Sequence, residues 1–148
     1  ASNVEQLIPI ALKLQPVDTG VYPETPVLTT ILGDWWDGFH LDMGNVEREG
    51  GVAFKNGKKP ERLLRRLLTL FTRPGDTVLD PFSGSGTTAA VAHKMRRRWV
   101  AVESGAQCRS HIVPRLGRVV DGRDHTGVTA VTGWTGGGGW RGMRLADG

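Results

Sequence analysis

The hydrophobic and polar positions between residues 77 and 102 predict a strand, a glycine turn, a helix and a second strand. Residues 77–80 are typical of a short strand, and Gly84 and Gly86 predict a tight turn directly after it. A run of small residues follows, which predicts a helix that can pack closely on a sheet. Residues 99–102 predict a second buried strand, which so short a crossover should place parallel to the first and right-handed.

Two further helices are predicted, one on each side of this unit. Pro60 suits the first turn of a helix over residues 61–71, where its missing N–H costs nothing. Apolar residues recur there at helical spacing and should form one face: Leu63, Leu64, Leu67, Leu68 and Phe71. Residues 107–120 predict another amphipathic helix, which Pro114 could kink.

The two ends of the chain carry weaker patterns. Residues 1–14 fit a short helix, and residues 27–32 could form a brief strand. Residues 128–134 and 140–145 each suit a strand, with a four-glycine tract between them. The sequence therefore predicts mixed helix and strand throughout, with the strongest signals in its centre.

Length and composition suit one globular domain, because 148 residues with 39% apolar side chains can bury a core. Cys108 is the single cysteine, which leaves no partner for a disulfide, and we assign no metal ligands. No apolar run could span a bilayer and no signal peptide is visible, so we expect a cytoplasmic protein. We expect an N-terminal segment at 1–50, an α/β unit at 51–125 and a glycine-rich segment at 126–148.

Arginines give the chain a net charge of +4 and a pI of about 9.7. They cluster at residues 62–66 and 96–98. Such clusters are either solvated helix faces or contacts to nucleic acid phosphates. A net charge this small favours the solvated faces when it is considered alone.

The central turn is compatible with several classes of nucleotide-type cofactor. A nucleoside triphosphate loop needs a lysine after its last glycine, and the threonines after Gly86 exclude that class. A dinucleotide-binding turn fits better, since Gly84, Gly86 and Ala89 match its spacing. Glu103 stands at the end of the second strand, near the place where that fold has an acidic residue. The glycine spacing alone therefore does not separate a dinucleotide from another nucleoside cofactor.

The residue before the turn changes this balance. Asp80 ends the first strand, where a dinucleotide fold stays apolar up to its first glycine. A carboxylate at this position suits a positively charged ligand rather than a pyrophosphate. S-adenosylmethionine carries a sulfonium and an ammonium group, and Glu103 could accept hydrogen bonds from its two ribose hydroxyls.

The turn at residues 80–88 follows an Asn-Gly-Lys-Lys-Pro-Glu stretch within residues 54–61. These two segments resemble the cofactor motif and the preceding Asn/Gly/Lys-Pro-Glu helix of amino-group DNA methyltransferases of the beta arrangement, and in particular of the C-terminal part of type III restriction–modification methyltransferase subunits. Residues 49–51, 111–116 and 134–141 extend the likeness, which covers roughly residues 30 to 145. The resemblance implies an α/β fold, namely a partial Rossmann-like methyltransferase fold with an incomplete parallel sheet flanked by helices.

The resemblance also implies the residues that bind S-adenosylmethionine. The methionine side of the cofactor should be lined by Asp80, Phe82, Gly84, Ser85 and Gly86. Glu103 should hold the ribose, and Lys59, with Asn56 near it, should approach the methionine carboxylate. Each has a simpler alternative role, such as a helix cap for Asp80 or a surface position for Lys59.

The family's catalytic Asp/Asn-Pro-Pro-Tyr motif is missing, since no two of the eight prolines are adjacent. By resemblance the chain is therefore the cofactor-binding part of a DNA methyltransferase, with adenine-N6 implied but cytosine-N4 not distinguished, and inactive alone. Expected partners are DNA in a complete enzyme, a restriction subunit or a chain with the catalytic half, and a second copy. The alternatives are a non-catalytic remnant or interaction module, and a dinucleotide-binding oxidoreductase domain.

Overall fold

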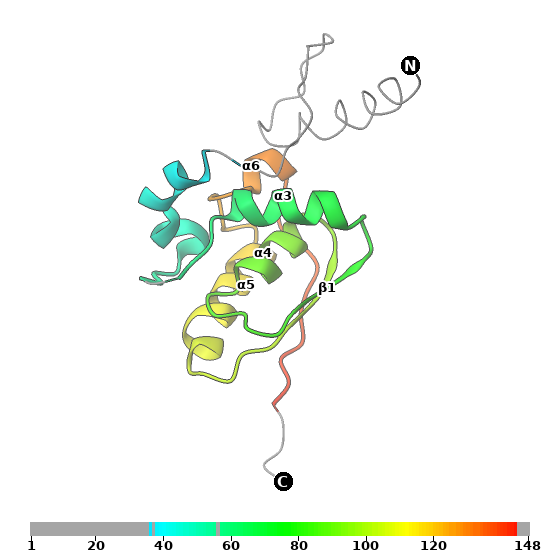
Figure 1. The fold of residues 1–148 in the computed structure, drawn as a ribbon. Coiled ribbons are helices and arrows are strands. Elements are labelled where there is room, and N and C mark those ends of the chain that lie inside the picture. The colour runs from blue at the N-terminus through cyan, green and yellow to red at the C-terminus, as the bar shows by residue number, and fades with distance from the viewer. Residues whose placement is uncertain (1–35, 37, 56, 145–148) are drawn as a thin grey trace.

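A computed structural model describes residue 36, residues 38–55 and residues 57–144 of the chain (Figure 1). The helix expected at 1–14 and the strand expected at 27–32 lie outside the described residues. Among the residues described, no helix combines the length and the apolar character that crossing a membrane requires.

The centre of the fold is a two-stranded parallel sheet. Strand β1 (Thr77–Asp80) pairs with β2 (Arg98–Ala101), and helix α4 (Thr87–Lys94) connects them. Leu79 lies opposite Val100 in the register. The predicted strand–turn–helix–strand unit and its parallel pairing are confirmed, as is the α/β class with an incomplete sheet flanked by helices.

Helices cover one face of this sheet. Figure 1 shows α4 between α3 (Glu61–Phe71) and α5 (Val113–Val120), and α4 contacts both of them. The small residues at 89–92 of α4 are at most 1% exposed, so the neighbouring helices approach closely, as their size predicts. Two apolar clusters form the core: Leu68, Val91, Ala92 and Val128 in one, and Ala89, Ile112 and Leu116 in the other.

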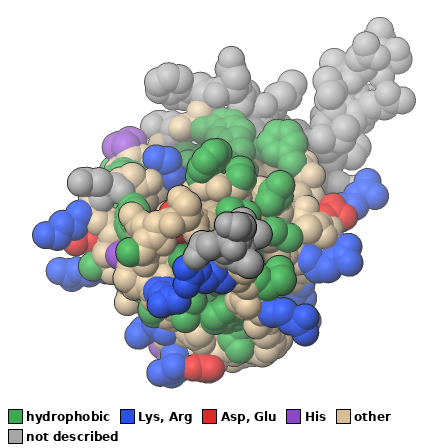
Figure 2. All heavy atoms as spheres, turned by 90° about the horizontal axis from the view of Figure 1, so that it is seen from below, with side chains coloured by type: hydrophobic (Ala, Val, Ile, Leu, Met, Phe, Trp, Pro, Cys, Tyr) green, Lys and Arg blue, Asp and Glu red, His purple; other side chains and the backbone are tan. Residues whose placement is uncertain are grey.

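The other face of the sheet has no such cover in the described part of the chain. Side chains alternate between the faces of a strand, so Val78 and Trp99 pack against the core while Leu79 and Val100 point away from it. Leu79 is 64% exposed and Val100 is 49% exposed. The space-filling view in Figure 2 likewise shows hydrophobic side chains at the surface, between groups of Lys and Arg. Within residues 38–55 and 57–144, the sheet is therefore open on one face.

Helix α3 has the predicted bounds but not the predicted buried face. Leu64 and Leu68 pack in the core, whereas Phe71 is 77% exposed. Arg65 and Arg66 are buried instead. The prediction that all four leucines and Phe71 share one apolar face toward the core is therefore wrong, because Phe71 points to solvent and two arginines are buried in its place.

The arginines of α3 fasten a corner made of two 3-10 helices, η1 (Phe39–Gly44) and η2 (Val46–Gly51). Arg62 binds Asp42 at 2.8 Å, and its guanidinium lies 4.4 Å from the centre of the Phe39 ring. Arg66 lies 4.6 Å from the Trp36 ring centre. The two contacts between guanidinium groups and aromatic rings are cation–π interactions within the fold. The cluster at 62–66 is therefore occupied by intramolecular contacts and is not the solvated face that charge alone favoured.

The last helix and the C-terminal segment differ from expectation. The predicted helix at 107–120 begins as a π-helical turn, η3 (Cys108–Ile112), and continues as α5. The strand expected at 128–134 is wrong, since α6 (Thr129–Thr132) forms there, and residues 140–144 have no regular secondary structure. Thr126 donates to the Asp124 carboxylate through its backbone N–H, which makes a local turn before α6.

Candidate functional site

The glycine turn begins where β1 ends. The carboxylate of Asp80 accepts the backbone N–H of Phe82 at 3.1 Å. The backbone N–H of Ser83 donates to the carbonyl of Val102, and Gly86 donates to the carbonyl of Ser83 at 2.7 Å. The turn is thus anchored at its start by Asp80 and tied across to the end of β2.

Gly86 combines an unusual backbone conformation with a close contact. Its φ is +75°, and a Cβ there would lie 3.3 Å from side-chain atoms of Ile112. Gly84 has a φ of +50°, and a Cβ there would meet only Phe54 at 3.8 Å. Gly86 is therefore required by the fold itself, whereas Gly84 leaves space beside the backbone.

Glu103 comes into contact with this turn, as the parallel pairing of the strands requires. Its two carboxylate oxygens accept the N–H groups of Gly84 and Gly105, each at 2.8 Å. Asp80 and Glu103 thus lie at the carboxyl ends of neighbouring strands and are both half-buried. The two carboxylates that sequence reasoning singled out stand on either side of the turn.

The remaining predicted residues of the turn differ in exposure. The side chain of Phe82 is 88% exposed. Ser85 is buried, and its hydroxyl pairs with that of Thr87 at 3.0 Å. A ligand at this edge would meet Phe82 and the backbone of the turn before it met the Ser85 hydroxyl.

The lysine pair before α3 divides into two environments. Lys59 is exposed, and Asn56 lies outside the described residues. Lys58 is 2% exposed and its ammonium donates to the carbonyl oxygens of Glu47, Glu49 and Val52. Burial lowers the pKa of Lys58 to about 8. Sequence reasoning missed this residue, because nothing in a Lys-Lys pair indicates which of the two turns inward.

A buried network of charges lies behind the turn. Glu61 and Lys94 form an ion pair at 2.8 Å, and Lys94 pairs with Asp124 at 2.7 Å. Arg115 binds the other oxygen of Glu61 at 2.8 Å. Burial would raise the pKa of Asp124, but hydrogen bonds from Lys94 and Thr126 outweigh it and hold that pKa below its usual value.

This network reaches the turn through Arg115. One terminal nitrogen of its guanidinium donates to the Thr87 hydroxyl at 2.7 Å and to the Ser85 carbonyl at 3.3 Å. The sequence patterns predict no partner for Glu61 or for Arg115, which are 54 positions apart. Only the fold shows that α3 and α5 meet at these two charges.

An aromatic pair lies next to Gly84. Phe54 and His111 pack edge to face with ring centres 5.1 Å apart, and a ring nitrogen of His111 is 3.0 Å from the Ala53 carbonyl oxygen. This contact holds the segment before Lys58 against η3. It places the predicted 54–61 segment and the glycine turn on the same side of the molecule.

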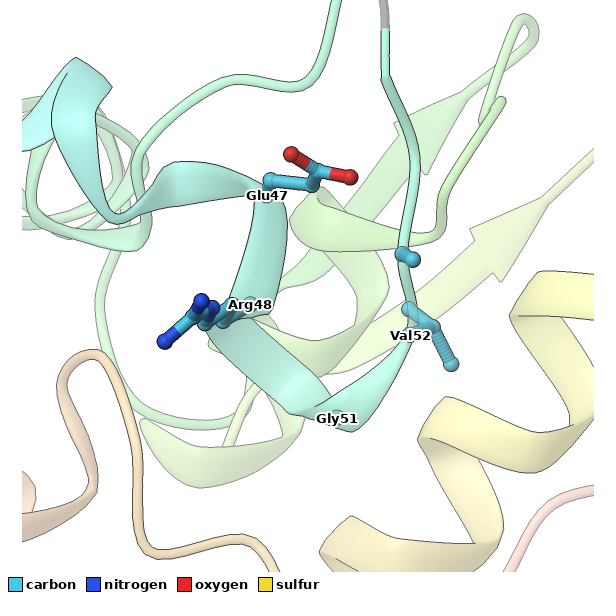
Figure 3. A pocket seen from close by; sticks show the side chains of 5 residues that line it. Glu47, Arg48, Gly51 and Val52 are labelled. Atoms are coloured by element: carbon cyan, nitrogen blue, oxygen red, sulfur yellow. The ribbon is translucent and has the colours of Figure 1, made fainter.

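A hollow of about 370 Å³ lies nearby and is lined by Glu47, Arg48, Gly51, Val52 and Ala53. Figure 3 shows Glu47 and Arg48 extending from η2 in different directions, with Val52 on the following segment. None of the predicted cofactor residues is among these lining residues. We therefore locate the candidate site at the turn, where the two carboxylates and the open space beside Gly84 are, rather than at this hollow.

Comparison with known proteins agrees with the motifs. A family model described as DNA methylase matches residues 25–113. The chain is 47% identical over 104 residues to the probable type III restriction-modification enzyme HindVI Mod subunit of Haemophilus influenzae, which is 70% of this chain and 14% of that protein. It is 52% identical over 74 residues to the type II methyltransferase M.BamHI of Bacillus amyloliquefaciens, which is 50% of this chain and 16% of that protein. The chain thus spans a small part of these relatives' length, and it belongs to the DNA methylase family.

Proposed function

We propose that this chain is the S-adenosylmethionine-binding part of a DNA amino-methyltransferase. The observation that carries the proposal is the pair of half-buried carboxylates, Asp80 and Glu103, on either side of a glycine turn at the carboxyl ends of two parallel strands. Ligands of open α/β sheets bind at this edge. Membership of the DNA methylase family supports the same assignment.

The residues present suit this cofactor chemically. S-adenosylmethionine supplies an activated methyl group and carries positive charge, which the Asp80 carboxylate attracts. Each oxygen of Glu103 accepts one backbone N–H and keeps further acceptor capacity for ribose hydroxyls. Gly84 leaves room for a ligand against the backbone. Lys59, which is exposed, is free to approach the methionine carboxylate.

The catalytic step belongs to another part of the protein in this proposal. The sequence has no adjacent prolines, so it lacks the Pro-Pro motif that clamps the target amino group. The two relatives are much longer than the matched segment, and one is a Mod subunit of a restriction-modification enzyme. We propose that the complete protein methylates DNA, at adenine-N6 in preference to cytosine-N4, and that it works beside a restriction subunit.

The test is calorimetric titration of the chain with S-adenosylmethionine and, separately, with NAD. We expect binding of S-adenosylmethionine only, weakened at least about tenfold by Asp80→Asn and by Glu103→Gln, because each removes a charge-assisted contact. Asp121→Asn is the matched control, since Asp121 is exposed and pairs with Arg123 away from the turn. Binding of NAD would favour the oxidoreductase alternative, and binding of neither ligand by the folded chain would favour a remnant.

The test of Glu103 requires a second pair of ligands, because its carboxylate also accepts a hydrogen bond from the turn and could act through the turn alone. S-adenosylhomocysteine and its 2′-deoxyribose analogue separate the two roles. If Glu103 binds the ribose, Glu103→Gln should weaken the first ligand much more than the second. Equal weakening of both would mean that Glu103 acts on the turn alone.

A further inference from the structure

One buried guanidinium connects the glycine turn to the interior. Arg115 is fully buried, and one of its terminal nitrogens donates to Thr87 and to the carbonyl of Ser85. The other terminal nitrogen donates to Glu61 at 2.8 Å. The same side chain therefore holds both ends of the Ser85–Thr87 segment to Glu61, the first residue of α3.

The surroundings leave this guanidinium little freedom to move. Glu61 is itself fixed, since its second oxygen accepts Lys94 at 2.8 Å and the backbone N–H of Val128 at 3.0 Å. Gly50 has a φ of +71°, and a Cβ there would lie 2.4 Å from the Nε of Arg115. The backbone of Gly50 thus packs closely against the Arg115 side chain.

We propose that Arg115 is a positioning residue that fixes the backbone of residues 83–87 in the geometry required for cofactor binding. This inference rests on the proposed function and deepens it, because it concerns the same turn. The physical reason is preorganisation: a loop that is already ordered loses less conformational freedom when a ligand binds. Arg115 does not touch the ligand, and it acts through Ser85 and Thr87.

Lys94 provides the control that a positioning role requires. It carries the same charge, is equally buried and binds the same Glu61 carboxylate. Its other partners are Asp124 and the Thr126 carbonyl, so it makes no contact with the turn. If Arg115 only stabilised the fold, Arg115→Met and Lys94→Met should change the affinity for the cofactor and the amide exchange of the turn to the same extent. If Arg115 positions the turn, Arg115→Met should change both quantities more than Lys94→Met does.

The experiment compares the parent chain, Arg115→Met and Lys94→Met in two measurements. The first is calorimetric titration with S-adenosylmethionine at a temperature where circular dichroism shows each chain folded. The second is hydrogen–deuterium exchange of the backbone amides of residues 84–88 without ligand. For Arg115→Met we expect affinity at least about tenfold weaker and faster exchange in the turn, because hydrogen bonds from a charged donor are lost. For Lys94→Met we expect less than about a threefold loss of affinity and unchanged exchange in the turn.

A second pair of variants covers the case in which Arg115→Met does not fold. Thr87→Val keeps the shape of the side chain but removes the hydroxyl that accepts Arg115, and Thr87→Ser keeps that hydroxyl. We expect faster exchange and weaker binding for Thr87→Val only. Parent-like behaviour of Thr87→Val in both measurements would overturn the inference.

The outcomes separate this inference from the proposed function. If the parent binds and Arg115→Met and Lys94→Met lose affinity equally, the inference is wrong and the proposed function stands. If the folded parent does not bind but Arg115→Met alone loosens the turn, the proposed function is wrong and the positioning by Arg115 is supported. Unchanged exchange in Arg115→Met would overturn the inference in either case.

Discussion

Replacing Glu61 by glutamine would disturb the centre of the buried network. The carboxylate accepts the ammonium of Lys94 and the guanidinium of Arg115, both at 2.8 Å, and the N–H of Val128 at 3.0 Å. All three charged side chains have no exposed surface. Glutamine has nearly the same shape but only one acceptor oxygen, and its NH₂ group would face a donor. One of the two cations would then be left without a counter-charge in the interior.

The size of the effect follows from that geometry. Removing one partner of a buried ion pair costs about 3–5 kcal/mol, and a domain is stable by only about 5–15 kcal/mol. Because the glutamine oxygen keeps one of the contacts, we expect Glu61→Gln to lower the free energy of unfolding by about 3 kcal/mol. Urea unfolding followed by circular dichroism should show a lower midpoint with an unchanged slope. Glu47→Gln, at an exposed position of η2, is the control and is expected to lie within about 0.5 kcal/mol of the parent.

A loss below about 1 kcal/mol for Glu61→Gln, with the slope unchanged, would refute the reasoning, because surface carboxylates behave in that way. A double-mutant cycle with Lys94→Met provides a sharper criterion. If the two side chains are direct partners, the double variant should lose clearly less than the sum of the single losses. Strict additivity would contradict the ion pair.

Three further predictions concern other parts of the chain. Lys58 has a pKa of about 8 in the fold against an ordinary 10.5, so the unfolded chain binds more protons between these pH values and stability should rise with pH there. Urea titrations should show this rise, at most about 1.4 kcal/mol per pH unit, in the parent but not in Lys58→Met. Gly50→Ala should lower the melting temperature measurably, because the added Cβ would lie 2.4 Å from Arg115 in a backbone with φ +71°. Replacing Leu79 and Val100 by threonine should reduce any concentration-dependent self-association in analytical ultracentrifugation, and an unchanged mass would show that the open sheet face does not drive it.

The parts of the fold that sequence reasoning found are those set by short stretches of the chain. Residues 77–102 carry an alternation of apolar strand, glycine turn and small-residue helix that few other structures satisfy. The position of Asp80 and Glu103 at the same edge of the sheet follows from the parallel crossover between their strands. The start of α3 at Glu61, directly after Pro60, likewise depends on a local preference.

The errors arise where distant residues decide the outcome. Val128 and its neighbours have strand-forming side chains, yet α6 forms because Val128 enters the core beside Leu68 and its N–H reaches Glu61. Arg65 and Arg66 are polar by type, yet both are buried, and the guanidinium of Arg66 lies over the rings of Trp36 and Phe39, which are distant in the sequence. No periodicity in the sequence indicates a contact of this kind.

The contact between Glu61 and Arg115 could not be predicted from the sequence for the same reason. Glu61 and Arg115 are separated by 54 positions, and each is an ordinary surface residue when its own helix is considered alone. A buried ion network is weak evidence for stability, since well-packed apolar residues of similar volume often do as well. The position of the network says more about function, because Arg115 at one end of it donates a hydrogen bond to the backbone of the glycine turn.

The network and the exposed sheet face differ in what they would require of the larger protein that we propose. The contacts that fix the turn, from Asp80, Glu103 and Arg115, all lie within this chain, so the turn needs no other segment to hold its shape. Leu79 and Val100, in contrast, expose apolar surface that a larger domain would cover. We therefore expect added parts of the protein to raise solubility and supply the catalytic groups while changing the affinity for S-adenosylmethionine little. A large gain in that affinity on extending the chain would mean that the turn is only half of the cofactor site.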